Sequence, residues 1–271
     1  MKLYFAGGET TSWLGAINKA KATKSLCSYF SLGAQLKKPD NIKKFIALSA
    51  MTQKHLFLDS GAFSAKTKGV KIDLDEYCRF IKEHQQHFAV YANLDVIGDY
   101  KGTMKNQRYM ESKGLKPLPC YHYGEPIQVL KDMAAEYKYL AIGGLVPIAK
   151  NKAELTRFLD RVFSIVQNKV KIHGFGMTGQ MILKRYPFYS VDSTSWLGGS
   201  MRAEVYKFDS ATGTMNCLYT SSKDEVTPDS FLYTDQDDKR WMPRVINNAI
   251  EWMKFEKYIT NLWKERGIEW N

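Results

Sequence analysis

The sequence places acidic side chains at the ends of short apolar runs, where a carboxylate needs a specific reason to be. Asp59 and Ser60 follow HLFL, Asp95 follows VYANL and Asp192 follows YSV. Desolvating an unpaired carboxylate is costly, so each of these aspartates must be hydrogen-bonded or functional. Two carboxylates in one pocket can divide the labour of glycosyl transfer, one as nucleophile and the other as proton carrier, or they can hold a divalent metal.

Histidines and glycines occur at corresponding places in other runs. His122 and His173 could act as acid or base, although a single histidine after a strand is more often structural. Gly143 and Gly144 would let a ligand approach the backbone closely, and they would equally suit a tight turn. The aspartates, in turn, could simply cap the helices that follow them. Aromatic side chains nearby could stack on a planar base or pack in the core, namely Phe63, Tyr91, Tyr121, Tyr123, Phe175 and Trp196.

Apolar runs alternate with amphipathic stretches along the first 200 residues. Strands are expected at 2–7, 25–32, 55–61, 88–96, 115–124, 139–145, 170–177 and 188–196. Helices are expected at 14–22, 41–50, 74–87, 102–113, 126–137, 151–166 and 179–186. This alternation predicts βα units on a parallel sheet.

Eight strands that alternate with helices predict a TIM-type (β/α)8 barrel over residues 1–200. Residues 201–271 are expected to form an appendage on that barrel, with a hairpin over 207–222 and a helix over 241–266, so that 1–271 is a single domain. An open doubly wound sheet is the runner-up, but no G-x-G-x-x-G opens a helix after the first strand. In a barrel the carboxyl ends of the strands share one mouth, where the polar residues above would converge.

Charge and composition restrict the partners and the compartment. Lys and Arg number 39 against 28 Asp and Glu, a net charge of +11 that favours a polyanion such as nucleic acid. The four cysteines, Cys27, Cys78, Cys120 and Cys217, form no C-x-x-C pair, so we expect reduced thiols. The first residues show no cleavage signal, and no apolar stretch approaches the roughly 20 residues that span a bilayer. We therefore expect a cytoplasmic protein with no membrane partner.

Four motifs, taken in order, resemble the tRNA-guanine transglycosylase superfamily. They are L-D-S-G-A-F (58–63), I-G-G-L (142–145), H-G-F-G (173–176) and V-D-S (191–193). The superfamily includes a branch that inserts 7-deazaguanines into DNA, and the resemblance covers about residues 55–196. It implies a base exchange by double displacement on a β/α barrel, with no cofactor and no catalytic metal.

The resemblance also implies unequal roles for the carboxylates. Asp192 would attack C1′ of a guanosine and hold a covalent sugar intermediate. Asp59 would act as general base for the incoming deazaguanine, and Ser60 beside it would contact substrate. Asp95 would accept hydrogen bonds from the N1–H and 2-amino groups of a guanine-like edge.

The remaining substrate-binding residues implied by the resemblance surround the base. Gly143 and Gly144 would provide backbone contacts. Phe63 would stack on the base, and His173 would stand where the family has the opposite wall. His122 occupies the position where the family often carries a base-contacting glutamine.

The chain also departs from the family's tRNA enzymes. Those enzymes carry a Cys-rich zinc site after the nucleophile strand, whereas only Cys217 follows Asp192 here, so no zinc subdomain is expected. The chain reads D-S-T-S-W where they have a Pro-Thr-Arg run, and Ala62 and Ser64 replace a glycine and a glutamine. Because the zinc element belongs to the tRNA-specific apparatus, DNA is the favoured polymer, with a free 7-deazaguanine base as co-substrate.

Three other functions stay open at this point. The first is the same base exchange on tRNA. The second is a carboxylate-based hydrolase of glycosides or nucleosides, which would use the same aspartates with water as acceptor. The third is a non-catalytic nucleic-acid-binding barrel, for which the basic charge suffices and the aspartates act as helix caps.

Overall fold

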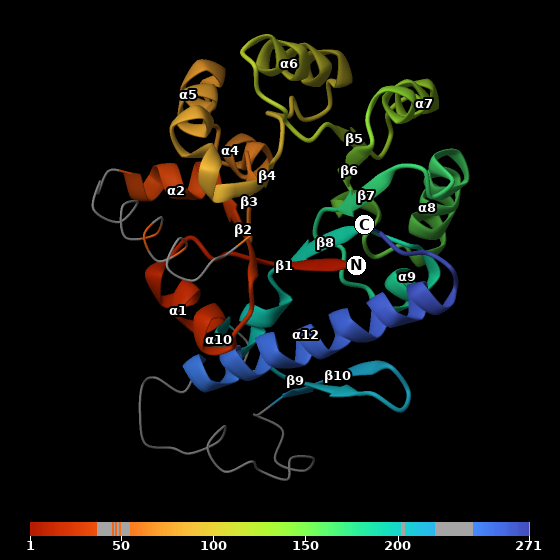
Figure 1. The fold of residues 1–271 in the computed structure, drawn as a ribbon. Coiled ribbons are helices and arrows are strands. Elements are labelled where there is room, and N and C mark those ends of the chain that lie inside the picture. The colour runs from red at the N-terminus through yellow and green to blue at the C-terminus, as the bar shows by residue number, and fades with distance from the viewer. Residues whose placement is uncertain are drawn as a thin grey trace.

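The computed structural model describes residues 1–36, 45, 47, 49, 55–201, 204–219 and 241–270. Within these residues, eight parallel strands form one curled sheet, with helices alternating along the chain (Figure 1). The strands are β1 (Lys2–Ala6), β2 (Lys24–Ser28), β3 (His55–Asp59), β4 (Phe88–Tyr91), β5 (Cys120–His122), β6 (Tyr139–Gly143), β7 (Lys171–Gly174) and β8 (Ser190–Ser193). Their order in the sheet is β4-β3-β2-β1-β8-β7-β6-β5. The alternating pattern of the sequence therefore predicted the parallel α/β sheet correctly.

The helices lie around the outside of the curled sheet (Figure 1). They are α1 (Thr11–Lys19), α2 (Tyr29–Leu36), α4 (Ala62–Thr67), α5 (Leu74–His84), α6 (Tyr100–Ser112), α7 (Ile127–Glu136), α8 (Lys152–Val166), α9 (Gln180–Arg185), α10 (Gly198–Met201) and α12 (Trp241–Glu265). Several begin at a side chain that accepts a hydrogen bond from the first turn, as Asp73 does for α5 and Asn151 for α8. These caps fix the residue at which each of these helices begins.

The two edge strands of the sheet approach each other. Just beyond β4, Ala92 pairs with Leu118 in an isolated parallel bridge. The N–H of Asn93 donates to the Leu118 carbonyl at 3.0 Å, and the Leu118 N–H donates to the Tyr91 carbonyl at 2.8 Å. The chain at the end of β4 and the segment before β5 thus share two backbone hydrogen bonds.

The two faces of the sheet are both apolar, as expected for parallel strands covered on each side. Along β1, Leu3 and Phe5 pack under the helices, whereas Tyr4 and Ala6 point to the concave face. The concave face is filled by small and aromatic side chains from many strands, namely Tyr4, Ala6, Leu26, Phe57, Ala92, Leu118, Cys120 and Ala141. This filled interior supports the residues at the carboxyl ends of the strands.

The second strand is shorter than the sequence predicted. The apolar run over 25–32 suggested a strand throughout, but β2 ends at Ser28 and α2 begins at Tyr29. The Ser28 hydroxyl accepts a hydrogen bond from the Ser31 N–H at 3.3 Å, and this local bond turns the chain into the helix. The helix expected over 41–50 lies mostly outside the described residues.

The fifth strand and the segment after β3 also differ from the prediction. The strand expected over 115–124 is reduced to β5, because Pro117 and Pro119 lack the N–H that a full ladder needs. The helix α4, which the apolar pattern did not indicate, starts directly after the D-S-G motif. It brings Phe63 to the carboxyl ends of the strands.

The segments after β8 form the predicted hairpin and long helix. The hairpin pairs β9 (Glu204–Asp209) with β10 (Thr214–Tyr219), and the residues 220–222 that the prediction added lie outside the described residues. The helix α12 runs between this hairpin and the sheet (Figure 1). Its buried Asn248 and Glu251 accept hydrogen bonds from the N–H groups of Tyr206 and Phe208. These bonds cover the free edge of β9. Among the described helices, none is long and apolar enough to cross a bilayer.

Candidate active site

A cavity of about 850 Å³ opens at the carboxyl ends of the strands. Sites for small molecules typically measure roughly 300–1,000 Å³, so this cavity can hold a ligand of that class. Its lining includes all but two of the site residues expected from the sequence, namely Asp59, Ser60, Phe63, Asp95, His122, Gly143 and Gly144. The other two, Asp192 and His173, lie directly behind the lining residues Phe175 and Gly176.

The D-S-G motif shapes the end of β3. Gly61 has a φ of +77°, and a Cβ at this position would lie 2.4 Å from the Ser28 hydroxyl. Only glycine fits this tight turn. The Gly61 N–H then donates to Asp59 Oδ2 at 3.1 Å, which orients the carboxylate toward the cavity that it lines. Ser60 is buried, and its carbonyl accepts the Phe30 N–H, so the turn is anchored to α2.

The surroundings of the Asp59 carboxyl group raise its affinity for a proton. Burial, followed by the charges of Asp95 and Asp192, raises the pKa of Asp59 to about 7, although the Gly61 N–H lowers it in part. A carboxyl group with a pKa near 7 exists in both forms at neutral pH. It can therefore donate and accept protons in turn, as a general acid–base catalyst must.

Phe63 presents an exposed apolar ring at the rim of the cavity. It lies in the first turn of α4 and is 56% exposed, which is unusual for phenylalanine. An exposed aromatic ring beside a pocket offers a surface on which a planar base can stack.

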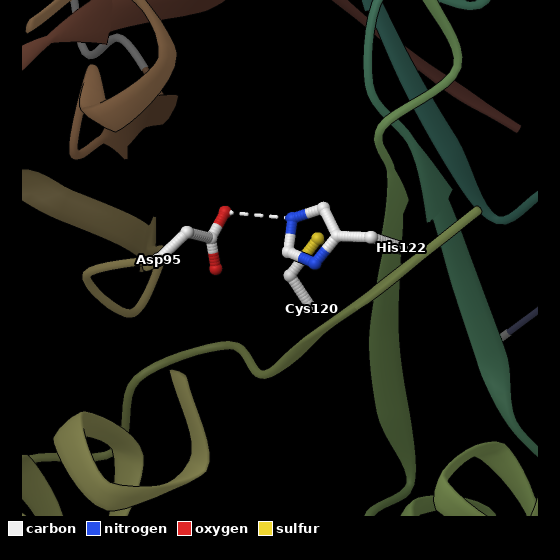
Figure 2. Close-up of side chains that lie close together, drawn as sticks. All are labelled: Asp95, Cys120 and His122. Atoms are coloured by element: carbon white, nitrogen blue, oxygen red, sulfur yellow. Dashed lines mark hydrogen bonds and ion pairs between the residues drawn. The ribbon is translucent and has the colours of Figure 1, made fainter. Parts of the chain in front are cut away.

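Asp95 and His122 meet across the cavity (Figure 2). His122 Nε2 lies 3.1 Å from Asp95 Oδ2, and His122 Nδ1 lies 3.0 Å from Glu125 Oε1. Glu125 also accepts the backbone N–H of His122 at 3.1 Å, so the ring is clamped between two carboxylates. The second oxygen of Asp95, Oδ1, is buried and has no hydrogen-bond partner among the described residues.

This clamp favours the protonated form of His122. Burial acts to lower the pKa of His122, but Cys120, Asp95 and Glu125 outweigh burial and raise the pKa well above its ordinary value. The clamp therefore favours an ion pair in which His122 donates to Asp95 and Glu125.

The glycine pair at the end of β6 makes room for this arrangement. A Cβ on Gly143 would lie 3.0 Å from both Cys120 Sγ and His122 Cδ2, and Gly144 has a φ of +68°. Both glycines are thus required by the close packing of His122, in addition to lining the cavity.

Asp192 is held by donors on β7 and on the segment after it. Its Oδ1 lies 3.2 Å from His173 Nε2 and accepts the Gly176 N–H at 3.0 Å. The Asp192 side chain is one-tenth exposed, and no donor among the described residues reaches its Oδ2. One oxygen of Asp192 is therefore fixed, while the other is free.

His173 takes a different position from the one the resemblance implied. It is fully buried, and its ring packs against Phe57 and Phe175 with centroids 4.6 Å away in each case. Since a buried ring cannot face a base, the wall of the cavity at this strand is formed by Phe175. His173 instead contacts the carboxylate of Asp192.

No protein-family model matches the chain, and no curated protein matches it in sequence.

The described residues contain one group with the donor types of a metal site, Asp95, Cys120 and His122, whose ligand atoms lie within 4.8 Å of one another (Figure 2). A metal would have to displace two firmly held protons. Burial raises the pKa of the Cys120 thiol to about 12, and His122 is protonated by its clamp. Thiolate and neutral imidazole are the forms that bind metal, so these residues fit an ion pair better than a metal site.

A first prediction follows from this fit. Purified protein should contain less than stoichiometric zinc by elemental analysis, and treatment with EDTA should leave its catalytic rate unchanged. One bound zinc per chain, together with loss of activity on chelation that zinc restores, would show that the three residues form a metal site.

The sequence did not indicate Glu125, Ser190 or Tyr139, although Glu125 contacts His122, Ser190 contacts His173 and Tyr139 contacts Ser190. Ser190 and Tyr139 carry a usable signal, because they stand two and four residues before Asp192 and Gly143 on their strands and so face the same side. No such signal marks Glu125 in the sequence, because its contact with His122 depends on the turn that follows β5.

Proposed function

We propose that this protein is a transglycosylase that exchanges guanine in nucleic acid, with DNA as the favoured polymer, for a free 7-deazaguanine base through a covalent aspartyl–sugar intermediate. The observation that carries this proposal is the clamped Asp95–His122 pair in a cavity that also presents Asp59. Asp192 lies behind that cavity and would supply the nucleophile.

The Asp95–His122 pair complements the edge of guanine. Guanine and 7-deazaguanine both offer an acceptor at O6 and donors at N1 and the 2-amino group. The Asp95 carboxylate can accept from the two donors, and its free Oδ1 has no other partner among the described residues. Both N–H groups of His122 are held by Asp95 and Glu125, so His122 orients the Asp95 carboxylate toward those two donors. Adenine has neither an N1–H nor a 2-amino group, so it would leave the Asp95 carboxylate without those two donors.

The chemistry requires two displacements at C1′. In the first, Asp192 Oδ2 attacks C1′, the bond from C1′ to N9 breaks, and guanine N9 takes a proton from the Asp59 carboxyl group. In the second, the ionised Asp59 removes the proton from N9 of the deazaguanine, N9 attacks C1′, and the bond from C1′ to Asp192 breaks. A pKa of about 7 suits Asp59 to both transfers.

One feature supports DNA over tRNA as the polymer. No histidine and only one cysteine, Cys217, follow Asp192 in the sequence, so the ligands of the zinc element in the family's tRNA enzymes are missing. The net charge of +11 suits a polyanion of either kind. A duplex would have to release its guanine from the stack, and the exposed ring of Phe63 at the rim could support the flipped base.

We also infer that the curled sheet is a (β/α)8 barrel that closes between β4 and β5. Support comes from the bridge between Ala92 and Leu118 and from the concave cluster, in which side chains from both edges meet. The carboxyl ends of barrel strands are where active sites of this fold lie.

The proposal is tested by release of label from DNA or tRNA that carries radioactive guanine. We expect release from DNA only when a 7-deazaguanine base is added, with the new base incorporated in equal amount. Release from tRNA alone would show that tRNA is the substrate instead of DNA. Release without added base would indicate a hydrolase, and binding without release would overturn the catalytic function altogether.

A second prediction concerns the base-reading carboxylate. Asp95→Asn replaces an acceptor by an amide donor that faces the N–H groups of the base. Leaving such groups unpaired costs about 1–3 kcal/mol, so the KM for the deazaguanine should rise about 10- to 100-fold. Asp132→Asn, on the exposed surface of α7, is the matched control and should leave KM unchanged. Equal KM values for the two variants would remove Asp95 from the base site.

A further inference from the structure

A chain of hydrogen bonds runs behind Asp192 through three neighbouring strands. The Tyr139 hydroxyl on β6 lies 2.6 Å from Ser190 Oγ on β8, and Ser190 Oγ lies 2.8 Å from His173 Nδ1 on β7. His173 Nε2 then lies 3.2 Å from Asp192 Oδ1. Ser190 and His173 are both fully buried, so water does not compete for these bonds.

The hydrogen-bonding capacities of Asp192 and His173 determine which group donates and which accepts at each step of this hydrogen-bond chain. An ionised Asp192 can only accept, so the hydrogen of a neutral His173 must be on Nε2. Nδ1 then accepts from the Ser190 hydroxyl, and the Ser190 oxygen accepts from the Tyr139 hydroxyl. Each group donates once, and no donor in the chain is left unpaired.

The rings around His173 allow no competing arrangement. Tyr4, Phe57 and Phe175 pack against the imidazole, with ring centroids at 6.3, 4.6 and 4.6 Å. Among the described residues, only Ser190 and Asp192 offer hydrogen-bonding partners to its two nitrogens. The ring therefore has one orientation in which both nitrogens are satisfied.

We propose that Tyr139, Ser190 and His173 are positioning residues that hold the hydrogen of His173 on Nε2 and thereby select Asp192 Oδ2 as the attacking oxygen. This inference rests on the proposed function. Oδ1 is occupied by two donors, from His173 and from the Gly176 N–H at 3.0 Å, whereas Oδ2 has no donor among the described residues. Attack at C1′ thus uses the free oxygen.

The same two donors act most strongly on the second displacement. In the covalent intermediate Asp192 is an ester, and its negative charge returns as the bond from C1′ to Oδ2 breaks. Donors already aimed at Oδ1 stabilise that returning charge. They also draw charge from the carboxylate before it attacks, so their loss should slow the breakdown of the intermediate more than its formation. Disruption of the chain should therefore make the intermediate accumulate.

The first measurement needs no activity. Nitrogen-15 NMR of the imidazole distinguishes the two tautomers and the imidazolium. In the wild-type protein we expect a protonated Nε2 and an accepting Nδ1 for His173. Ser190→Ala should shift the nitrogen signals toward an exchanging mixture. A wild-type His173 with its hydrogen on Nδ1, or on both nitrogens, would overturn the proposed direction of the chain.

The second measurement compares kinetics and trapped intermediate in four variants. Ser190→Ala and Tyr139→Phe should lower kcat about 10- to 100-fold at constant KM and raise the steady-state fraction of covalent adduct. His173→Phe should lower kcat about 10²- to 10³-fold, whereas His173→Gln, which keeps a donor near the Nε2 position, should recover most of that loss.

The matched control is Tyr189→Phe. The ring of Tyr189 packs edge-on against Tyr139, but its hydroxyl bonds Lys2 and takes no part in the chain. This variant should keep the wild-type kcat and adduct fraction. Equal effects of Tyr139→Phe and Tyr189→Phe, or a fall in adduct in step with thermal stability, would reduce the chain to a structural role. If the wild-type protein exchanges no base, the proposed function fails, and the NMR result still decides the direction of the chain.

Discussion

Asp192→Asn should lower base exchange about 10⁴-fold or more and abolish any covalent link between protein and nucleic acid, because an amide oxygen is a far weaker nucleophile than a carboxylate. The asparagine keeps the size of the side chain, and its oxygen can still accept from His173 and Gly176. The fold should therefore be unchanged. A labelled oligonucleotide that comigrates with the protein on a denaturing gel measures the adduct.

The location of Asp192 makes this a demanding test. Its side chain is only one-tenth exposed and lies behind Gly176, so a nucleotide must reach past the cavity lining to contact Oδ2. Asp132→Asn should form adduct at the wild-type level. An adduct that survives Asp192→Asn would assign the nucleophile to another residue, and Asp59, the other predicted catalytic carboxylate, would be the next candidate.

The sequence was sufficient to predict the parallel sheet, and most of the site residues that it indicated line one cavity. The reason is geometric: when strands are parallel, residues that directly follow them are brought to one edge whatever the details of the helices. Asp59, His122 and Gly143 stand at the ends of their strands, and they converge as expected. Asp95 stands four residues beyond β4 and still reaches His122.

The relations between these residues could not be predicted, because they depend on which neighbour each side chain meets. His173 faces the interior and bonds Asp192 since β7 and β8 are adjacent in the sheet. The charge of His122 depends on Glu125, which the turn after β5 folds back onto the ring. Strand ends were equally uncertain where a serine or a proline interrupted an apolar run, as at Ser28 and Pro119.

Asp59→Asn should produce the second large effect, a loss of about 10²- to 10⁴-fold in exchange, the range for removal of a general acid–base group. In the wild-type protein, guanine release needs protonated Asp59, and the incoming base needs ionised Asp59. With a pKa of about 7, the rate of exchange should be highest near pH 7 and fall on both sides. In the variant the residual rate should lose this maximum. A wild-type maximum that persists in Asp59→Asn would assign the titration to another group.

The same substitution should stabilise the fold at alkaline pH. Because the pKa of Asp59 is raised above the ordinary value of 3.8, the folded protein binds more protons than the unfolded chain between about pH 4 and 7, so wild-type stability falls as pH rises through this range. The shift corresponds to at most about 4 kcal/mol at pH 8. Asp59→Asn carries no charge there, and it keeps an oxygen that can accept the Gly61 N–H.

Thermal unfolding of both proteins from pH 4 to pH 8 measures this difference. At pH 8 the variant should melt roughly 5–10 °C above the wild type, and the two melting temperatures should converge near pH 4. Asp132→Asn should follow the wild-type curve throughout. Equal melting curves for wild type and Asp59→Asn at pH 8 would mean that ionisation of Asp59 does not destabilise the folded protein. The pKa of Asp59 would then not be raised, and Asp59 would not be suited to donate a proton in the first displacement and remove one in the second.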